Sequence, residues 1–328
     1  MNSDLISASP LFAQRPDLSS DLFMVGDPNV DIYFTTRQIP VAGEKRLGQM
    51  LGCFAGGTES NVACSASRLG LAVGVCGRVG DDAYADMLLA EFSRFGVSTA
   101  HVTRMPGVTS ASALIMVPPD GEKALVYSAM TAPLAPVEDM LGLLEQSRAF
   151  YCAPYDLPRF LVQAQAARGF GTDVIIDIET AMAPDTTTFH GLLSAADVVF
   201  MSSDSFRELT GQPPSLEALH SLLDFGPRLL IVTLGVDGAM AVSGAGNCQH
   251  PGFPQIAVDS TGAGDCFAGA FLACALQGGT LAESMAFACA AACFAVQEFG
   301  ARSGYPWRAD VEARLHSADF QQIPATVR

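Results

Sequence analysis

The most informative stretch of the sequence is Ile256-Ala-Val-Asp259-Ser-Thr-Gly262-Ala-Gly264-Asp265-Cys-Phe-Ala-Gly269-Ala-Phe271. It predicts a short strand that leads into a Gly-Ala-Gly turn, from which a long helix over 263–276 begins. Glycines allow the backbone to present consecutive N–H groups, and a helix start adds unpaired donors and the positive end of the helix dipole. The turn is therefore a candidate anion-binding site that needs no lysine.

Asp265 lies inside this turn. A carboxylate beside an anion site is unfavourable unless it takes a proton from an attacking group. The simpler interpretation is a helix cap, which is the usual role of Asp at such a position. Gly-Ala-Gly-Asp taken alone favours the cap, and it lacks the G-x-G-x-x-G spacing of dinucleotide-binding folds.

Short apolar runs alternate with helical patterns along most of the chain. Buried strands are expected at 22–25, 72–76, 150–152, 174–178, 198–201 and 229–234. Amphipathic helices are expected at 84–95, 159–168 and 216–223, and small-residue helices at 263–276 and 281–298. This alternation predicts an α/β protein whose parallel sheet is covered on both faces.

Two segments break the alternation. Residues 31–54 are rich in β-branched and turn residues, and 113–117 and 124–127 form a hairpin pattern around Pro118-Pro-Asp-Gly121. The pattern alone fits a small accessory sheet and ordinary edge strands equally well.

Composition excludes several functional classes. The 328 residues include 18 Lys+Arg and 34 Asp+Glu, a net charge of −16, which disfavours nucleic-acid binding. The 49% hydrophobic and 16% charged residues exclude a disordered or coiled-coil protein. Lys45 and Lys123 are the only lysines, and neither follows a glycine, so the chain has no P-loop.

The remaining patterns indicate one cytoplasmic domain. The nine cysteines are scattered, form no C-x-x-C and have no histidine at finger spacing, which predicts reduced thiols and no zinc. Residues 1–20 lack a basic start and are expected to be a flexible tail before a single domain at 21–328. No uncharged run is long enough for a membrane span.

Several motifs in the same order resemble the ribokinase-like (PfkB) carbohydrate kinases. Asp259–Asp265 with Gly269-Ala270 resembles the C-terminal signature of that family, and Gly56-Gly-Thr-Glu-Ser-Asn-Val-Ala63 resembles the N-terminal one. The similarity continues through 77–82, 233–238 and 300–307. It implies a three-layer α/β/α sandwich with a mostly parallel central sheet and a small β-sheet lid made of 31–54 and 113–127.

The resemblance implies a kinase that passes the γ-phosphoryl group of ATP to a hydroxyl of a small sugar. Asp265 would accept the hydroxyl proton, and the amides of Gly262, Ala263, Gly264 and Asp265 would stabilise the transferring group. Such transfers depend on alignment and charge neutralisation, so Mg²⁺ is expected.

The resemblance also assigns binding residues by position. The acceptor would contact Asp31, Gly56, Gly57 and Asn61. The nucleotide would lie along Ser202, Thr233, Gly235, Gly238 and Cys289, of which Cys289 fits helix packing equally well. A loop for K⁺ would comprise Asp259, Thr261, Ala295, Glu298, Gly300 and Gly304. A homodimer formed through the lid is a further expectation.

Two departures from the family pattern affect the site. The usual Asn-x-x-Glu element is replaced by Ser202 and Ser205, for which Asp204 or Glu208 could substitute as the acidic group near magnesium. Glu59 occupies a position where a small residue is usual, and its carboxylate could bind a polar acceptor, pair with Arg or face solvent.

Three alternatives to a sugar kinase remain open. A nucleoside kinase of the same fold would need an aromatic platform, for which Phe34, Phe54 and Tyr127 are candidates. A catalytically inactive sugar-binding or regulatory protein would explain the missing Asn-x-x-Glu, although Asp265 argues against it. A nucleotide-binding dehydrogenase is the weakest alternative because its fingerprint is missing.

Overall fold

A computed structural model describes residues 11–118, 123–317 and 326–327. A ten-stranded sheet of order β14-β13-β12-β11-β10-β9-β8-β1-β4-β5 forms the centre of this part of the chain. The strands from β11 to β5 pair in parallel, and β12 to β14 add an antiparallel edge. Their bounds are β1 (Ser20–Val25), β4 (Val73–Val79), β5 (Ser98–Arg104), β8 (Ser147–Cys152), β9 (Asp173–Asp177), β10 (Val198–Ser202), β11 (Leu229–Thr233), β12 (Ala239–Ser243), β13 (Gly246–His250) and β14 (Thr326–Val327).

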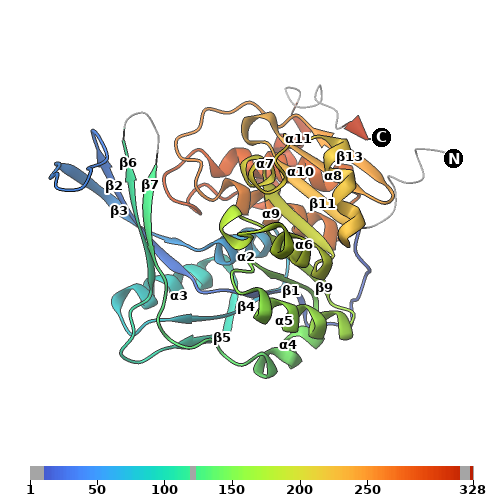
Figure 1. Cartoon of the computed structure of the whole chain (residues 1–328), viewed down its shortest axis with the longest axis horizontal. Helices are drawn as coiled ribbons and strands as arrows, with labels where there is room; N and C mark the ends of the chain where they lie inside the picture. The colour runs from blue at the N-terminus through green and yellow to red at the C-terminus, as the bar shows by residue number, and fades with distance from the viewer. Residues whose placement is uncertain (1–10, 119–122, 318–325, 328) are drawn as a thin grey trace.

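Helices cover both faces of this sheet, as the alternation predicts. One apolar core lies under α2 (Thr58–Arg68), α3 (Ala83–Phe95), α9 (Ala263–Leu276), α10 (Leu281–Ala295) and α11 (Arg308–His316). The opposite core lies under α4 (Leu141–Glu145), α5 (Leu157–Gly169), α6 (Thr186–Ala195), α7 (Ser203–Thr210) and α8 (Leu216–Leu222). Four 3₁₀ turns are η1 (Val137–Met140), η2 (Thr180–Met182), η3 (Leu223–Phe225) and η4 (Gly235–Asp237). The layers are seen in Figure 1.

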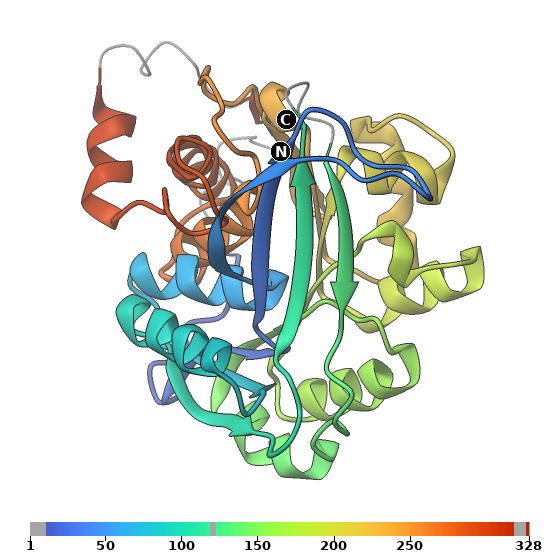
Figure 2. The same ribbon diagram turned by 90° about the vertical axis from the view of Figure 1, so that its left-hand side faces the viewer.

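The two irregular segments form a separate four-stranded sheet of order β3-β2-β6-β7. Its strands are β2 (Asn29–Thr36), β3 (Gly48–Gly56), β6 (Ala111–Val117) and β7 (Ala124–Ser128). This small sheet stands beside the main body in Figure 1 and faces the viewer in Figure 2. The accessory-sheet interpretation is therefore correct, while the turn expected within 118–121 falls mostly outside the described residues.

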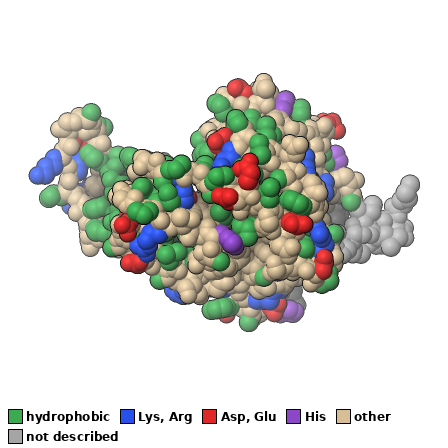
Figure 3. Space-filling view, turned by 90° about the horizontal axis from the view of Figure 1, so that it is seen from below, with side chains coloured by type: hydrophobic (Ala, Val, Ile, Leu, Met, Phe, Trp, Pro, Cys, Tyr) green, Lys and Arg blue, Asp and Glu red, His purple; other side chains and the backbone are tan. Residues whose placement is uncertain are grey.

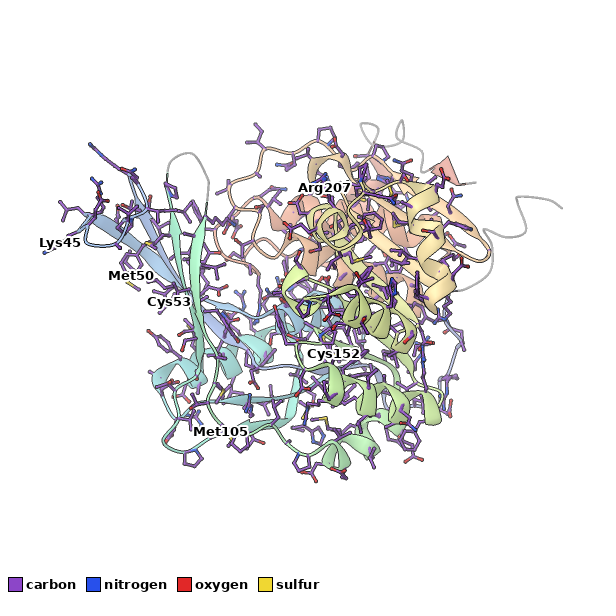
Figure 4. The ribbon with its side chains drawn as sticks, viewed as in Figure 1. Lys45, Met50, Cys53, Met105, Cys152 and Arg207 are labelled. Atoms are coloured by element: carbon purple, nitrogen blue, oxygen red, sulfur yellow. The ribbon has the colours of Figure 1, made fainter. Side chains whose placement is uncertain are left out.

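The outer end of the small sheet extends away from the body. Lys45 lies at this end, and Met50 and Cys53 follow inward along β3, whereas Cys152 lies deep in the body (Figure 4). From below, the small sheet projects as an arm with basic side chains near its end (Figure 3). Leu47, Leu125 and Val126 on it are exposed.

The flexible tail expected for residues 1–20 is wrong for residues 11–20. Phe12 is 3% exposed and packs in the core under α9 and α10, and Gln14 Nε2 donates to the carbonyl of Leu276. Arg15 donates to the carbonyls of Phe170 and Gly171. Apolar burial and these hydrogen bonds hold the segment on the domain. The first ten residues lie outside the described part.

Other expectations have mixed outcomes. The strand expected at Ile256–Asp259 does not form, because Val258 N–H donates to the carbonyl of Val296 and Ile256 is exposed. Helix α10 ends at Ala295, before the expected Glu298. The nine cysteines are unpaired, and only Cys53 and Cys274 are not fully buried. Within the described ranges, no helix combines the length and apolar character needed to cross a bilayer.

Candidate active site

The start of α9 has the backbone form that the sequence predicts. Gly262 has φ 75° and precedes the helix, and no side chain caps it. A Cβ at Gly262 would lie 2.4 Å from the carbonyl oxygen of Ala301, so only glycine fits there. Ala263 N–H donates to Ser260 at 3.3 Å, whereas the amides of Gly264 and Asp265 have no acceptor among the described residues. This helix start therefore offers free donors to an anion.

Asp265 does not cap the helix. Its Oδ2 accepts a hydrogen bond of 2.7 Å from Nδ2 of Asn61, 204 residues earlier in the chain. Burial raises the pKa of Asp265 to about 7, the charges of Glu179 and Asp31 act in the same direction, and Asn61 and Arg302 oppose the rise. A carboxyl group that titrates near neutrality can accept a proton at physiological pH.

A second helix start faces the first. Gly57 has φ 98° and precedes α2, again without a side-chain cap. A Cβ on the preceding Gly56 would lie 2.2 Å from Oδ2 of Asp31, so this glycine leaves room for the carboxylate. Asn29 Nδ2 donates to Asp31 Oδ1 at 2.7 Å, and burial raises the pKa of Asp31 to about 6. The four acceptor residues expected from the sequence thus lie in one region.

A close helix contact fixes the two helix starts relative to each other. A Cβ at Gly269 of α9 would lie 2.5 Å from Cβ of Ser65 and 2.8 Å from the carbonyl oxygen of Val62, both in α2. Ser65 Oγ donates to the carbonyl of Cys266 at 3.0 Å. The small residue allows the helix backbones to approach, which places Asn61 against Asp265.

A cavity of about 500 Å³ opens at the N-terminus of α9. Thr233, Gly235, Gly238 and Cys289 line it, as expected for nucleotide residues, and Ala263 and Gly264 form its end. Phe253, Phe267 and Val296 supply apolar walls, and no described lining residue is charged. The cavity suits a flat apolar ring whose phosphates reach the amides of α9.

Ser202 is not among the residues lining this cavity. It lies at the end of β10 beside Thr233, and its Oγ accepts the amide of Ser205 at the start of α7. Asp204 pairs with Arg207 on the surface, and Glu208 is exposed. The substitution by Asp204 or Glu208 therefore stays a prediction.

Sequence reasoning missed two acidic residues next to Asp265. Asp177 ends β9 and Glu179 follows it, and the pKa of Asp177 is raised to about 8 by burial and by the charges of Asp265, Glu179 and Glu59. Parallel strands bring their carboxyl ends to one edge of the sheet, so the end of β9 was the available signal. In the described part of the chain, no three His, Cys, Asp or Glu side chains are grouped to hold a metal ion.

The residues expected to bind K⁺ converge only in part. Asp259 Oδ1 accepts from the amide and hydroxyl of Thr261, and its Oδ2 accepts from Gly300 N–H at 3.1 Å. A Cβ on Gly304 would lie 3.0 Å from the carbonyl oxygen of Ala295, so that position is also close by. No described contact brings Glu298 to this loop. No sequence motif predicts which side chain pairs with Asp259. Lys123, beside the small-sheet hairpin, places its ammonium 2.9 Å from Asp259 Oδ1 and on Thr261 Oγ1.

A second cavity of about 450 Å³ lies beside Glu59, near the start of α2. Gly26, Asp27 and Glu59 line it, together with apolar side chains such as Leu134 and Phe160. Glu59 Oε1 accepts the amide of Ala153 at 3.0 Å, and burial raises its pKa to about 7. Glu59 therefore faces this cavity and does not pair with an arginine or extend into solvent.

Two of the aromatic candidates, Tyr127 and Phe54, have different surroundings. The charges of Asp27, Glu59 and Asp31 add to burial in raising the pKa of Tyr127, so its hydroxyl lies near these carboxylates. Phe54 instead packs edge-on against Tyr33 at 5.5 Å. Tyr155, which the sequence analysis missed, lines the cavity and donates to Glu179 at 2.8 Å.

Known carbohydrate kinases are similar to this chain in sequence and in structure. The profile of the family described as pfkB family carbohydrate kinase matches residues 19–308. The ribokinase of Bacillus subtilis (strain 168) is 28% identical over 314 residues, which cover 90% of this chain and 99% of that protein. The aminoimidazole riboside kinase of Salmonella typhimurium is 26% identical over 334 residues, covering 92% and 97%. The structure of Arabidopsis thaliana ribokinase complexed with ribose and ATP matches with TM-score 0.79 and 26% identity, over 92% of this chain and 100% of that one.

Proposed function

This chain belongs to the pfkB family of carbohydrate kinases and is an ATP-dependent kinase of the ribokinase-like fold, and we propose that Asp265 and the start of α9 carry out its phosphoryl transfer. Asp265 accepts the proton of the acceptor hydroxyl as that oxygen attacks the γ-phosphorus of ATP. The bond from the γ-phosphorus to the bridging oxygen breaks, and ADP leaves. The observation that carries this proposal is the juxtaposition of unpaired amides at Gly264 and Asp265 with a carboxyl group whose pKa is about 7.

The anion hole follows from the same helix start. The amides from Gly262 to Asp265, including those of Ala263 and Gly264, are aimed at the phosphates, with Gly264 and Asp265 as the strongest donors because they have no protein acceptor. Fixed dipoles need no reorganisation when charge develops on the transferring group. Thr233, Gly235, Gly238 and Cys289 hold the nucleoside part of ATP, and Ser202 lies beside Thr233 at the phosphate end.

Asp31, Gly56, Gly57 and Asn61 hold the acceptor. A carboxylate can accept two O–H bonds, which suits a sugar with neighbouring hydroxyls. Asn29 already occupies Oδ1 of Asp31, so Oδ2 and the remaining lone pairs face the acceptor. The glycines at 56 and 57 allow the sugar to approach the backbone.

We expect two cations at this site, Mg²⁺ with the nucleotide and K⁺ at a neighbouring loop. Mg²⁺ would be held chiefly by the ATP phosphates, where it would neutralise charge on the transferring group. Asp259, Thr261, Ala295, Glu298, Gly300 and Gly304 are the proposed monovalent-cation loop. Since Lys123 already supplies positive charge to Asp259, the requirement for added K⁺ is expected to be small.

A riboside acceptor is a second candidate, favoured by the cavity of about 450 Å³ beside Glu59. A bare pentose would leave most of this cavity empty. A second ring attached to the sugar would fill it, with Tyr127 and Tyr155 beside the ring and Glu59 to accept its N–H or O–H groups.

One screen tests these proposals. ADP release with Mg-ATP is measured over pentoses, hexoses and ribosides for the wild type and for Asp265→Asn. We expect acceptor-dependent turnover that falls by about 10³-fold or more in the variant, while nucleotide binding persists. A variant that retains turnover contradicts the base role, and ligand-induced stabilisation without turnover would indicate a binding protein.

A further inference from the structure

Arg302 makes two side-chain hydrogen bonds that no sequence motif predicts. It lies in the loop after α10 and is 3% exposed. Its Nε donates to Oδ1 of Asn61 at 2.7 Å, and its Nη2 donates to the carbonyl of Gly56 at 2.7 Å. Asn61, itself 4% exposed, then donates from Nδ2 to Asp265 at 2.7 Å. Arg302 therefore begins a buried series of hydrogen bonds that passes through Asn61 and ends at Asp265.

The donors and acceptors available on each side chain fix the direction of these hydrogen bonds. Arginine can only donate hydrogen bonds, so the Asn61 atom that faces it must be the carbonyl oxygen. The amide nitrogen of Asn61 is consequently turned to Asp265, where it is a donor to the carboxylate. A flipped amide would set NH₂ against the guanidinium and oxygen against the carboxylate, and both contacts would be repulsive. Arg302 therefore selects one of two amide orientations.

The charge of Arg302 is also unusual for a buried group. Within the described ranges, no carboxylate lies within 4.0 Å of its guanidinium, and its Nη1 has no hydrogen-bond partner. Its positive charge lowers the pKa of both Asp31 and Asp265 at longer range. An unpaired buried cation is costly, so a role at the site is a reason for its presence.

We propose that Arg302 is a positioning residue for phosphoryl transfer, which orients Asn61 toward Asp265 and supplies the positive charge that favours the carboxylate form of Asp265. This inference rests on the proposed role of Asp265 as the base. It goes beyond that role because Arg302 contacts the base only through Asn61.

The other charges around Asp265 make such a residue necessary. The acidic groups that face Asp265 come from four elements, and they are Asp31 of β2, Glu59 of α2, Asp177 of β9 and Glu179 after β9. Lys123 acts on Asp31 from the small sheet, and Tyr305 is close enough for the charge of Asp265 to affect it. Acidic neighbours and burial favour the protonated form of Asp265, and Asn61 and Arg302 are the two side chains that oppose them among the largest influences on its pKa.

The test compares Arg302→Gln and Arg302→Lys with Arg148→Gln. Arg148 is a matched control, because it is 9% exposed and donates to a carbonyl, that of Leu276, while pairing with Asp21 away from the site. The readout is the acid limb of the pH profile of kcat/KM. We expect R302Q to move this limb upward by about one pH unit, a tenfold loss on its acid side. R148Q should lower stability without moving the limb.

Arg302→Lys separates charge from geometry if R302Q folds poorly. Lysine keeps the positive charge but lacks the planar fork that serves Asn61 and Gly56 together. We expect its acid limb near the wild-type position and kcat lowered about tenfold. A folded R302Q whose limb is unmoved, or an R302K that matches R302Q in its limb, overturns the proposal.

A measurement without turnover keeps this test independent of the proposed function. The carboxyl carbon of Asp265 is followed by NMR against pH in the ligand-free protein and assigned by its absence in Asp265→Asn. If Arg302 acts as proposed, this titration moves upward in R302Q, even if D265N shows that Asp265 is not the base. An unchanged titration in R302Q contradicts the proposal regardless of activity.

Discussion

The nucleotide side and the acceptor side of Asp265 are lined by different kinds of polar group. On the nucleotide side, the cavity is lined by glycines, small residues and apolar walls, and the α9 amides supply the polarity. On the acceptor side, the polarity comes from side-chain charges: Asp31 and Glu59, and the pair of Asp27 with Arg78. Amide dipoles do not titrate, whereas carboxyl groups with raised pKa values do. The acceptor side should therefore be the side that responds to pH and to charge substitutions.

Among the substitutions that distinguish the two sides, Asp31→Asn on the acceptor side has the largest expected effect. Loss of a carboxylate that accepts hydroxyl hydrogen bonds costs about 1.5–3 kcal/mol. We expect kcat/KM for the acceptor to fall about 100-fold and KM for ATP to stay constant. Steady-state kinetics with each substrate varied in turn measure both. Asp86→Asn is the control because Asp86 is exposed and pairs with Arg104, and an equal loss for ATP would contradict the division between the two sides.

The second effect is the pH dependence of acceptor binding. The ionised form of Asp31 binds the hydroxyls, and its pKa is about 6, so affinity should be full above that value and fall as the pH decreases through it. About a tenfold loss is expected at pH 5. Calorimetry of acceptor binding between pH 5 and 8 measures it. Since Glu59 titrates in the same range, D31N is the reference, and a D31N protein with the same pH dependence would assign the effect elsewhere.

The same division explains what could be predicted from the sequence. The nucleotide side depends on backbone conformation coded locally, because Gly262 at φ 75° and the following helix start lie within a few residues of each other. The alternating strands and helices are equally local, which is why the layers could be anticipated, whereas the family resemblance was what favoured a small separate sheet over edge strands. Thr233, Gly235, Gly238 and Cys289 were assigned by motif and do line one cavity.

The acceptor side depends on contacts between distant residues. Arg302 and Asn61 are 241 positions apart, and Lys123 reaches Asp259 across 136 positions. No periodicity or spacing encodes such pairs, so the role of Arg302 and the partner of Asp259 required the folded chain.

A third and smaller effect tests the nucleotide side with two glycines. A Cβ on Gly264 meets no protein atom within 4 Å, so Gly264→Ala should fold normally while its methyl group intrudes on bound phosphates. We expect KM for ATP to rise about fivefold, equivalent to about 1 kcal/mol, with acceptor KM unchanged. Gly262→Ala is the contrast, since its positive φ and the carbonyl of Ala301 should reduce thermal stability. A G264A protein with normal ATP kinetics would argue against phosphates at this helix start.

The smallest effect concerns the cation that balances Asp259. Lys123 and Asp259 form a partly exposed ion pair, with side chains 30% and 3% exposed, and such pairs contribute up to about 1 kcal/mol. Lys123→Met leaves a buried carboxylate served only by Thr261 and Gly300, which a monovalent cation can then neutralise. We expect about a twofold to fivefold loss of activity in tetramethylammonium buffer and its recovery in KCl, whereas the wild type changes little.

Lys45→Met is the matched control for that substitution, because Lys45 is the only other lysine and lies at the outer end of the small sheet (Figure 4). If the two variants behave alike in both buffers, the effect of Lys123 belongs to the general charge of the small sheet and not to the Asp259 loop. If K123M alone gains a dependence on K⁺, the ammonium group and the metal ion serve the same carboxylate. The small sheet would then contribute a charge to the loop that precedes the start of α9.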